Sequence, residues 1–267
     1  MSEDLQRICQ WTYTNKLLLN PDKTKLVVLG SRPLVRKFEG LHLSLLGKEL
    51  TPAKSAKDLG VILDPNLTYE DHTTKTVSTC MSRLGQINRV KRVLDMDTLT
   101  IVVNCVVFSK LFYCSYVWIN TTESNLDKVQ KVQNFACRII SGVKKFDYIT
   151  PVLRVMQWLP IRQQLYYRNA VIAFNCVTGC APDNSDSLTD QFIKRSDVST
   201  RTTRSSKKLQ IPFLKSATGK RSLYYRTVRI WNALDPLLKL SSTLQESKQK
   251  LQSILLIKRL YRQYSVI

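Results

Sequence analysis

The spacing of apolar residues changes abruptly at Asp64-Pro65-Asn66, and this change is the strongest constraint on the fold. Before it, three short β-prone runs occur at 25–30, 41–47 and 59–63, separated by glycine, serine and proline. After it, apolar residues recur every three or four positions for most of the chain, as they do along one face of an α-helix. The sequence therefore predicts an α+β fold that is mostly α, with a small N-terminal antiparallel sheet followed by a helical bundle.

Individual helices can be placed from the same periodicity. A short helix from Glu3 should end before the turn signal Asn20-Pro21-Asp22. Helical faces follow at 77–87, at 126–140 with Gly142 as a C-cap, at 165–177 and at 244–260. The run 99–118 is apolar almost all round, which predicts a helix covered on every side. Lys110 lies near its centre, where a charge would cost a membrane span about 2.5–3.5 kcal/mol, so no transmembrane segment is expected.

Charge is distributed unevenly along the chain. The formal net charge is +21, and residues 190–267 hold 17 Lys and Arg against 4 Asp and Glu, whereas residues 1–189 hold 24 against 16. A boundary is expected at Cys180-Ala181-Pro182, where the helical pattern stops. We therefore predict three parts: 1–68 with the helix and short strands, 69–180 with the helical bundle, and 181–267 as a basic region of loop and terminal helices.

An excess of positive charge this large favours a polyanionic partner, and nucleic acid is the leading candidate before an anionic lipid surface. Cations of the last third alternate with Phe213, Tyr224 and Tyr225, whose rings can stack on unpaired bases. Trp231 is instead expected to anchor a core. The predicted phosphate-binding residues are Arg201, Arg204, Lys207, Lys208, Lys220, Arg221, Arg226 and Arg229.

Signals for other chemistry are weak. The pair Cys176 and Cys180 has neither a second cysteine pair nor a nearby histidine to complete a tetrahedral zinc site, and no P-loop or GxGxxG motif occurs. The acids of Glu70-Asp71-His72 and Asp95 suit helix N-termini. No catalytic residue, metal ligand or cofactor is predicted from these patterns.

Cysteine usage indicates the compartment. The seven cysteines are odd in number and mostly lie in apolar runs, as reduced thiols do, and the first residues form no apolar signal segment. An intracellular location, nuclear or cytoplasmic, is expected.

Several segments together resemble a known family. Trp11 with NKLLLNPDKTKLVVL at 15–29, and KDLGVILDPNL at 57–67, are similar to blocks of non-LTR, LINE-like (jockey or CR1-type) retrotransposon reverse transcriptases. YCSYVW at 113–118, the segment 126–142 and WNAL at 231–234 resemble later helical blocks of that family. The resemblance spans nearly the whole chain and implies the end of a palm, a helical thumb and a basic C-terminal region.

The resemblance also implies what this segment lacks. In that family, two metal ions are held by carboxylates of an upstream palm strand and of an Asp-Asp motif, and those blocks would lie before Met1. No Asp-Asp dipeptide occurs here, so magnesium is implied only for the full-length polymerase and no cofactor for this chain. Lys23 matches a family position near the incoming nucleotide, although a solvated turn lysine is preferred for the isolated chain.

We therefore expect a truncated reverse transcriptase (RNA-directed DNA polymerase) segment that lacks its own catalytic carboxylates. It should bind RNA, DNA or RNA-DNA hybrid without sequence selectivity. The alternative is a helical protein-interaction or acidic-membrane-surface module in which 244–260 packs on a partner helix or lies on lipid. A third possibility is an active polymerase whose missing carboxylates come from another chain. The sequence specifies no oligomeric state.

Overall fold

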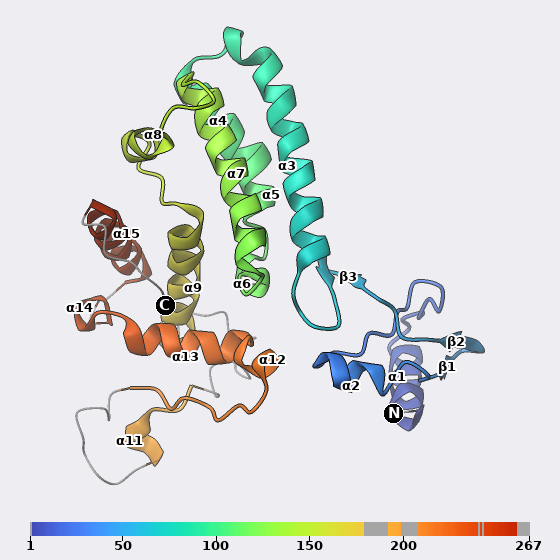
Figure 1. Ribbon diagram of the computed structural model, residues 1–267. Coiled ribbons are helices and arrows are strands. Elements are labelled where there is room, and N and C mark those ends of the chain that lie inside the picture. The colour runs from blue at the N-terminus through green and yellow to red at the C-terminus, as the bar shows by residue number, and fades with distance from the viewer. Residues whose placement is uncertain (1, 179–191, 199–207, 240, 242, 261–267) are drawn as a thin grey trace. The chain divides into compact units, whose positions relative to one another are not determined.

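The computed structural model describes residues 2–178, 192–198, 208–239, 241 and 243–260 (Figure 1). The chain divides into two compact units, Met1–His72 and Thr73–Ile267, and each is described by itself. The predicted division into 1–68, 69–180 and 181–267 stays a prediction, since its second boundary falls among residues outside the described part.

The first unit contains two short helices and two β-hairpins. The helices are α1 (Ser2–Thr14) and α2 (Arg32–Arg36), and the strands are β1 (Leu43–Leu45), β2 (Lys48–Leu50), β3 (Ala56–Asp58) and β4 (Val61–Leu63). β1 pairs with β2 in antiparallel register Leu43 to Leu50, and β3 pairs with β4 in register Ala56 to Leu63. Both hairpins turn through two residues of positive φ, Leu46-Gly47 and Leu59-Gly60, as two-residue hairpin loops favour. The strands therefore form two separate two-stranded sheets, where the sequence predicted one.

The prediction of a strand at Lys25–Gly30 was wrong. This run makes one isolated parallel bridge, between Leu26 and Pro52, and Gly30 donates its N–H to the carbonyl of Pro65. Proline has no N–H to donate, so a ladder cannot continue where prolines face the run. The run therefore forms no strand because the residues that face it are prolines. The β-propensity of the run itself does not reveal this.

The second unit is helical. Its described helices are α3 (Glu70–Val90, which begins in the first unit), η1 (Lys91–Val93), α4 (Met96–Val103), η2 (Asn104–Phe108), α5 (Ser109–Leu111), α6 (Ser115–Trp118), α7 (Glu123–Ser141), α8 (Ile149–Val155), α9 (Ile161–Thr178), α11 (Arg195–Val198), α12 (Ala217–Lys220), α13 (Leu223–Ala233), α14 (Pro236–Lys239) and α15 (Leu244–Leu260). The helices predicted at 77–87, 126–140, 165–177 and 244–260 are confirmed as α3, α7, α9 and α15. The expected acidic N-termini are present too, since α3 begins at Glu70 and Asp95 caps α4 by accepting the N–H of Thr98.

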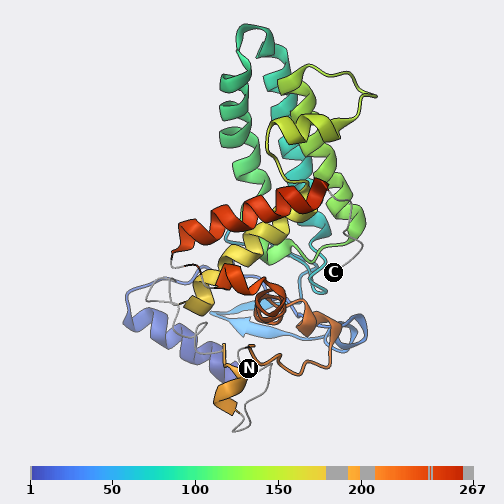
Figure 2. The same cartoon turned by 90° about the vertical axis from the view of Figure 1, so that its left-hand side faces the viewer.

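Two layers of packing hold these helices together. α7 packs against α4, α8 and α9, and its apolar face is buried from Leu126 to Ile140. α13 and α15 both lie against α9, as Figures 1 and 2 show from two sides. The core between these three helices contains Phe174, Trp231 and Leu251, so Trp231 is a core residue as predicted.

The run 99–118 differs from the single covered helix that was predicted. It is divided into α4, a π-helical turn (η2), α5 and α6, and Cys114 adopts a left-handed conformation with φ 46°. Trp118 is buried and its Nε1 donates to the carbonyl of Tyr113 at 3.0 Å, which satisfies a carbonyl left free where the helix breaks. Ile101 and Tyr113 are exposed, so the run is not covered on every side.

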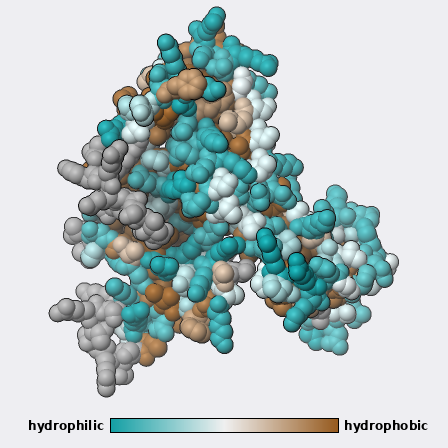
Figure 3. All heavy atoms as spheres, in the orientation of Figure 1, coloured by the Kyte–Doolittle hydropathy of each residue, from teal (hydrophilic) through white to brown (hydrophobic). Residues whose placement is uncertain are grey.

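Figure 3 shows one face of the second unit. In the space-filling view, hydrophilic side chains cover most of its visible face, and hydrophobic ones show at the end where α3 turns toward α4 (Figure 3). Val90, Val93 and Met96 of this turn are exposed. In the described residues no helix combines the length and hydropathy needed to cross a membrane.

The end of α7 gives a testable prediction about backbone conformation. Gly142 has φ 73° and its N–H donates to the carbonyl of Arg138 at 3.0 Å. A Cβ at this position meets no other atom within 4 Å, so Gly142→Ala introduces only left-handed strain, about 1 kcal/mol of destabilisation. Gly85→Ala is the control, because Gly85 lies inside α3 with equal free space and should gain about 0.5–1 kcal/mol. Urea unfolding followed by far-UV circular dichroism should show opposite signs, and equal signs would contradict this account.

Cys80 gives a prediction about alkaline pH. Its thiol is buried on α3 and donates to the carbonyl of Val107 at 3.7 Å, and burial raises its pKa from 9.0 to about 11. Between these values the unfolded thiol ionises while the folded thiol keeps its proton, so the free energy of unfolding should fall as the pH rises through this window. The loss is on the order of 2 kcal/mol. Cys80→Ala should remove this part of the decline in urea titrations at successive pH values, and an unchanged pH dependence would refute the assignment.

Candidate nucleic-acid interface

A basic pocket of about 460 Å³ lies on the second unit where three segments meet. The segments are the loop before α7 with the start of that helix, the first turns of α9, and α12 with α13. The described residues that line it include five cations and one carboxylate: Arg162, Lys220, Arg221, Arg226, Arg229 and Glu123. Four of the predicted phosphate-binding residues are thus brought together in one place.

Lys220 and Arg229 are exposed cations of this pocket on the α12–α13 side. Lys220 is the last residue of α12, and Arg229 lies on α13 with its guanidinium 6.0 Å from the ring centroid of Tyr225, which also lines the pocket. Among the described residues no carboxylate forms an ion pair with either of them. Both side chains can therefore reach a phosphate in solvent without first breaking an internal ion pair.

Arg226 and Arg221 are partly buried and form hydrogen bonds to neighbouring segments. Arg226 donates from Nη2 to the carbonyl of Tyr116 at 2.6 Å and from Nε to the carbonyl of Ser222. The carbonyl of Arg221 accepts from Asn120 Nδ2 at 2.6 Å. These bonds tie α13 and the turn before it to the α6–α7 region, so both residues shape the pocket besides adding to its charge.

Arg162 was missed by the sequence analysis. It is the second residue of α9, and its Nη2 contacts Glu123 Oε2 at 2.5 Å and Asp127 Oδ1 at 2.9 Å on α7. The two carboxylates raise the pKa of Arg162, Glu123 more than Asp127. An isolated arginine in an amphipathic helix carries no local signal of such pairing, which depends on α7 packing against α9. Because its charge is compensated, the net cationic character of the pocket comes from the α12–α13 residues.

Lys208 lies elsewhere on the unit. It precedes Leu209, which forms an antiparallel bridge with Lys194, and its carbonyl accepts the N–H of Arg195 at 2.9 Å. Lys239 is close enough that its pKa is lowered, first by burial and then by repulsion from Lys208. Lys208 is therefore part of a second basic cluster, defined by Lys194, Arg195, Lys208 and Lys239.

Of the remaining predicted residues, Lys23 alone lies in the described part of the chain. Arg201, Arg204 and Lys207 lie outside the described residues, as does Cys180. Lys23 is exposed in the first unit, where its N–H closes a turn on Asn20 by donating to its carbonyl and to its Oδ1, both at 3.2 Å.

Several acidic side chains have structural partners. Asp64 accepts from the N–H groups of Thr68 and Tyr69 and so holds the turn before α3. Asp22 pairs with Lys48 at 2.7 Å, which lowers the pKa of Asp22. Within the described part of the chain, no group of three or more His, Cys, Asp or Glu side chains is arranged to hold a metal ion.

Comparison with known proteins gives two relatives. The chain is 26% identical over 145 residues to the RNA-directed DNA polymerase from the mobile element jockey of Drosophila funebris, an alignment that covers 53% of this chain and 15% of the relative. It is 26% identical over 169 residues to a probable RNA-directed DNA polymerase from transposon BS of Drosophila melanogaster, covering 62% of this chain and 18% of the relative. No family model and no solved structure matches the chain.

Both relatives are polymerases of mobile elements, and the aligned segment spans less than a fifth of either. The chain is therefore related to RNA-directed DNA polymerases. The particular relatives confirm the resemblance drawn from the motifs, which pointed to non-LTR, LINE-like reverse transcriptases of the jockey type.

Proposed function

We propose that this chain is a segment of a retrotransposon reverse transcriptase that binds nucleic acid through its sugar-phosphate backbone without sequence selectivity. The observation that carries the proposal is the basic pocket, where Lys220 and Arg229 are exposed beside Arg221 and Arg226. Cations that neutralise phosphates release condensed counterions, and this gives affinity without reading base edges. The similarity to RNA-directed DNA polymerases supports nucleic acid as the polyanion.

The proposal includes the absence of independent polymerase activity. In-line nucleotidyl transfer with two metal ions needs carboxylates that clamp both ions. The sequence holds no Asp-Asp dipeptide, and acids such as Asp64 and Glu123 already have the structural partners described above. Primer extension with the purified chain, template, deoxynucleotides and magnesium should give no incorporation, and detectable synthesis would overturn this part of the proposal.

The packing of α15 argues against the alternative of a protein-interaction or membrane-surface module. It required the apolar face of α15 to be available for a partner helix or a lipid surface. Leu251 and Leu255 of this face are buried in the core against α9, so the helix is already occupied. Liposome flotation with acidic vesicles should therefore show only electrostatic attraction that added salt removes, and flotation that persists at high salt would favour the module.

Electrophoretic mobility shifts on RNA, DNA and RNA-DNA hybrids of one length test the binding itself. The three ligands should bind, and scrambling the base order should leave the affinity within about threefold, because contacts to phosphates carry no sequence information. Strong preference for one base order would contradict the proposal.

A further inference from the structure

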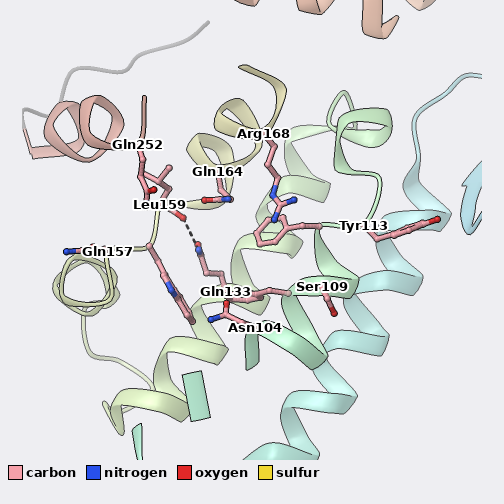
Figure 4. Close-up of a pocket in the computed structure, with 12 residues that line it drawn as sticks. Asn104, Ser109, Tyr113, Gln133, Gln157, Leu159, Gln164, Arg168 and Gln252 are labelled. Carbon is pink, nitrogen blue, oxygen red and sulfur yellow. Dashed lines mark hydrogen bonds between the residues drawn. The ribbon is translucent and has the colours of Figure 1, made fainter. Parts of the chain in front are cut away.

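A second pocket, of about 520 Å³, lies between η2, α5, α7, α9 and the turn that precedes α9 (Figure 4). None of the predicted phosphate-binding residues lines it. Its described lining contains one cation, Arg168, and no Asp or Glu. Apart from Leu159, the rest of the lining is aromatic or carries neutral amide and hydroxyl groups, and this composition differs from that of the basic pocket.

Arg168 has no counter-ion in this pocket. Its guanidinium lies 4.5 Å from the ring centroid of Phe112, and its Nε is buried without a hydrogen-bond partner among the described residues. Burial lowers the pKa of Arg168, since desolvation disfavours the charged form. An arginine stays protonated in proteins, so an anion that enters the pocket can compensate this partly buried positive charge.

The wall beside Arg168 is a row of aromatic rings. Phe112 and Phe108 meet edge-to-face with centroids 5.6 Å apart, and Phe108 and Trp158 meet in the same way at 4.8 Å. The π-helical turn η2 positions this wall, because its first and last residues, Asn104 and Phe108, both line the pocket. Rings of this kind stack on nucleobases at about 1–3 kcal/mol per base.

Amide groups complete the lining. Gln133 donates from Nε2 to the carbonyl of Leu159 at 2.9 Å (Figure 4). Its Oε1 accepts from Gln130 Nε2 at 2.8 Å, and the two bonds hold the side chain in place. Gln164 and Arg168 are one turn apart on α9 and both line the pocket. Side-chain amides carry both donors and acceptors, as the edges of nucleobases do.

We infer that this pocket binds one unpaired nucleotide, with its phosphate on the Arg168 guanidinium and its base against the Phe108, Phe112 and Trp158 wall. The volume lies within the range of about 300–1,000 Å³ of small-ligand pockets. The inference deepens the proposed function and rests on it for the nucleotide's source, which is either an extruded residue of a bound strand or a free mononucleotide.

Isothermal titration of the full chain with adenosine 5′-monophosphate tests the inference. Binding is expected, with adenosine alone and inorganic phosphate alone each weaker than the monophosphate. Arg168→Gln should weaken binding by about tenfold or more, the effect of losing a charge-assisted hydrogen bond. Arg89→Gln with Arg92→Gln, two exposed cations that line neither pocket, should leave it unchanged.

A second variant distinguishes loss of binding from loss of folding. Gln164→Glu places a carboxylate one turn before Arg168, where it can pair with the guanidinium and stabilise the helix while excluding an anion. It should abolish binding of the monophosphate while the thermal unfolding midpoint stays equal or rises. Retained binding in this variant, or no binding by the wild-type chain, would overturn the inference.

The two sources are separated by competition. A duplex with one unpaired nucleotide should displace the monophosphate more strongly than a fully paired duplex if a strand supplies the nucleotide, and equal displacement would favour the free mononucleotide. Failure of the inference is distinct from failure of the proposed function, because polymer binding without monophosphate binding refutes only the second pocket.

Discussion

Replacing both Lys220 and Arg229 by glutamine is expected to weaken nucleic-acid binding by roughly 10- to 100-fold near physiological salt, because each lost phosphate contact removes one counterion-release event. The slope of log affinity against log salt should become shallower by about 1.4–1.8, at about 0.7–0.9 for each contact. Both side chains are exposed and neither pairs with a described carboxylate, so folding should be unaffected. Fluorescence anisotropy with a labelled oligonucleotide measures both quantities.

Arg89→Gln with Arg92→Gln is the matched control for this variant. These two arginines are also exposed, on the last turn of α3 and in η1, and their removal lowers the net charge by the same amount. In the second unit they lie at the end of the bundle opposite α12 and α13 (Figure 1). The control should retain most of the wild-type affinity, and an equal loss in both variants would assign binding to overall charge instead of the basic pocket.

Trp231→Ala is expected to destabilise the second unit by about 3–5 kcal/mol, the usual cost of removing a buried tryptophan. Trp231 is 7% exposed in the core of α9, α13 and α15, its ring lies 6.3 Å from that of Phe174, and Lys239 Nζ lies 5.6 Å from its centroid. The cavity would remain largely unfilled, because three helices fix its walls. Urea unfolding followed by far-UV circular dichroism gives the change in stability.

Trp11→Ala serves as the control for the core substitution. Trp11 is 61% exposed on α1, so its replacement should change stability by no more than about 0.5 kcal/mol. Similar losses in the two variants would contradict the assignment of Trp231 to the core.

The sequence was informative where structure follows from local pattern. The apolar face from Leu126 to Ile140 correctly predicted α7, and Gly142 correctly predicted its C-cap. The face from Leu244 to Leu260 likewise predicted α15. In both helices the buried residues recur at helical spacing within one continuous segment, so the pattern needs no knowledge of the partner.

The errors fell where a distant partner decides the conformation. The run 25–30 has β-propensity, yet it faces Pro52 and Pro65, which cannot extend a ladder. The run 99–118 contains no glycine or proline to mark its break at Cys114, where a bond from Trp118 to Tyr113 replaces the helical one. Hydrophobic periodicity cannot anticipate either contact.

The candidate sites follow the same division. The excess of cations in the last third predicted Lys220, Arg221, Arg226 and Arg229, which the fold gathers into one pocket. Composition could not show that Arg226 also donates a hydrogen bond to the carbonyl of Tyr116. Nor could it show that Arg162 lines the pocket with its charge paired to Glu123 and Asp127. The second pocket carried no sequence signal, because Phe112 comes from a segment far in the chain from Trp158 and Arg168.

The most direct test of the central claim is the affinity of the wild-type chain for a nucleic-acid duplex of arbitrary sequence, measured as the salt concentration is raised. Backbone binding predicts a linear fall of log affinity with log salt whose slope corresponds to several released counterions, at about 0.9 for each neutralised phosphate of a DNA duplex. An affinity that is independent of salt, or no measurable binding at low salt, would contradict the claim that this basic surface binds nucleic acid.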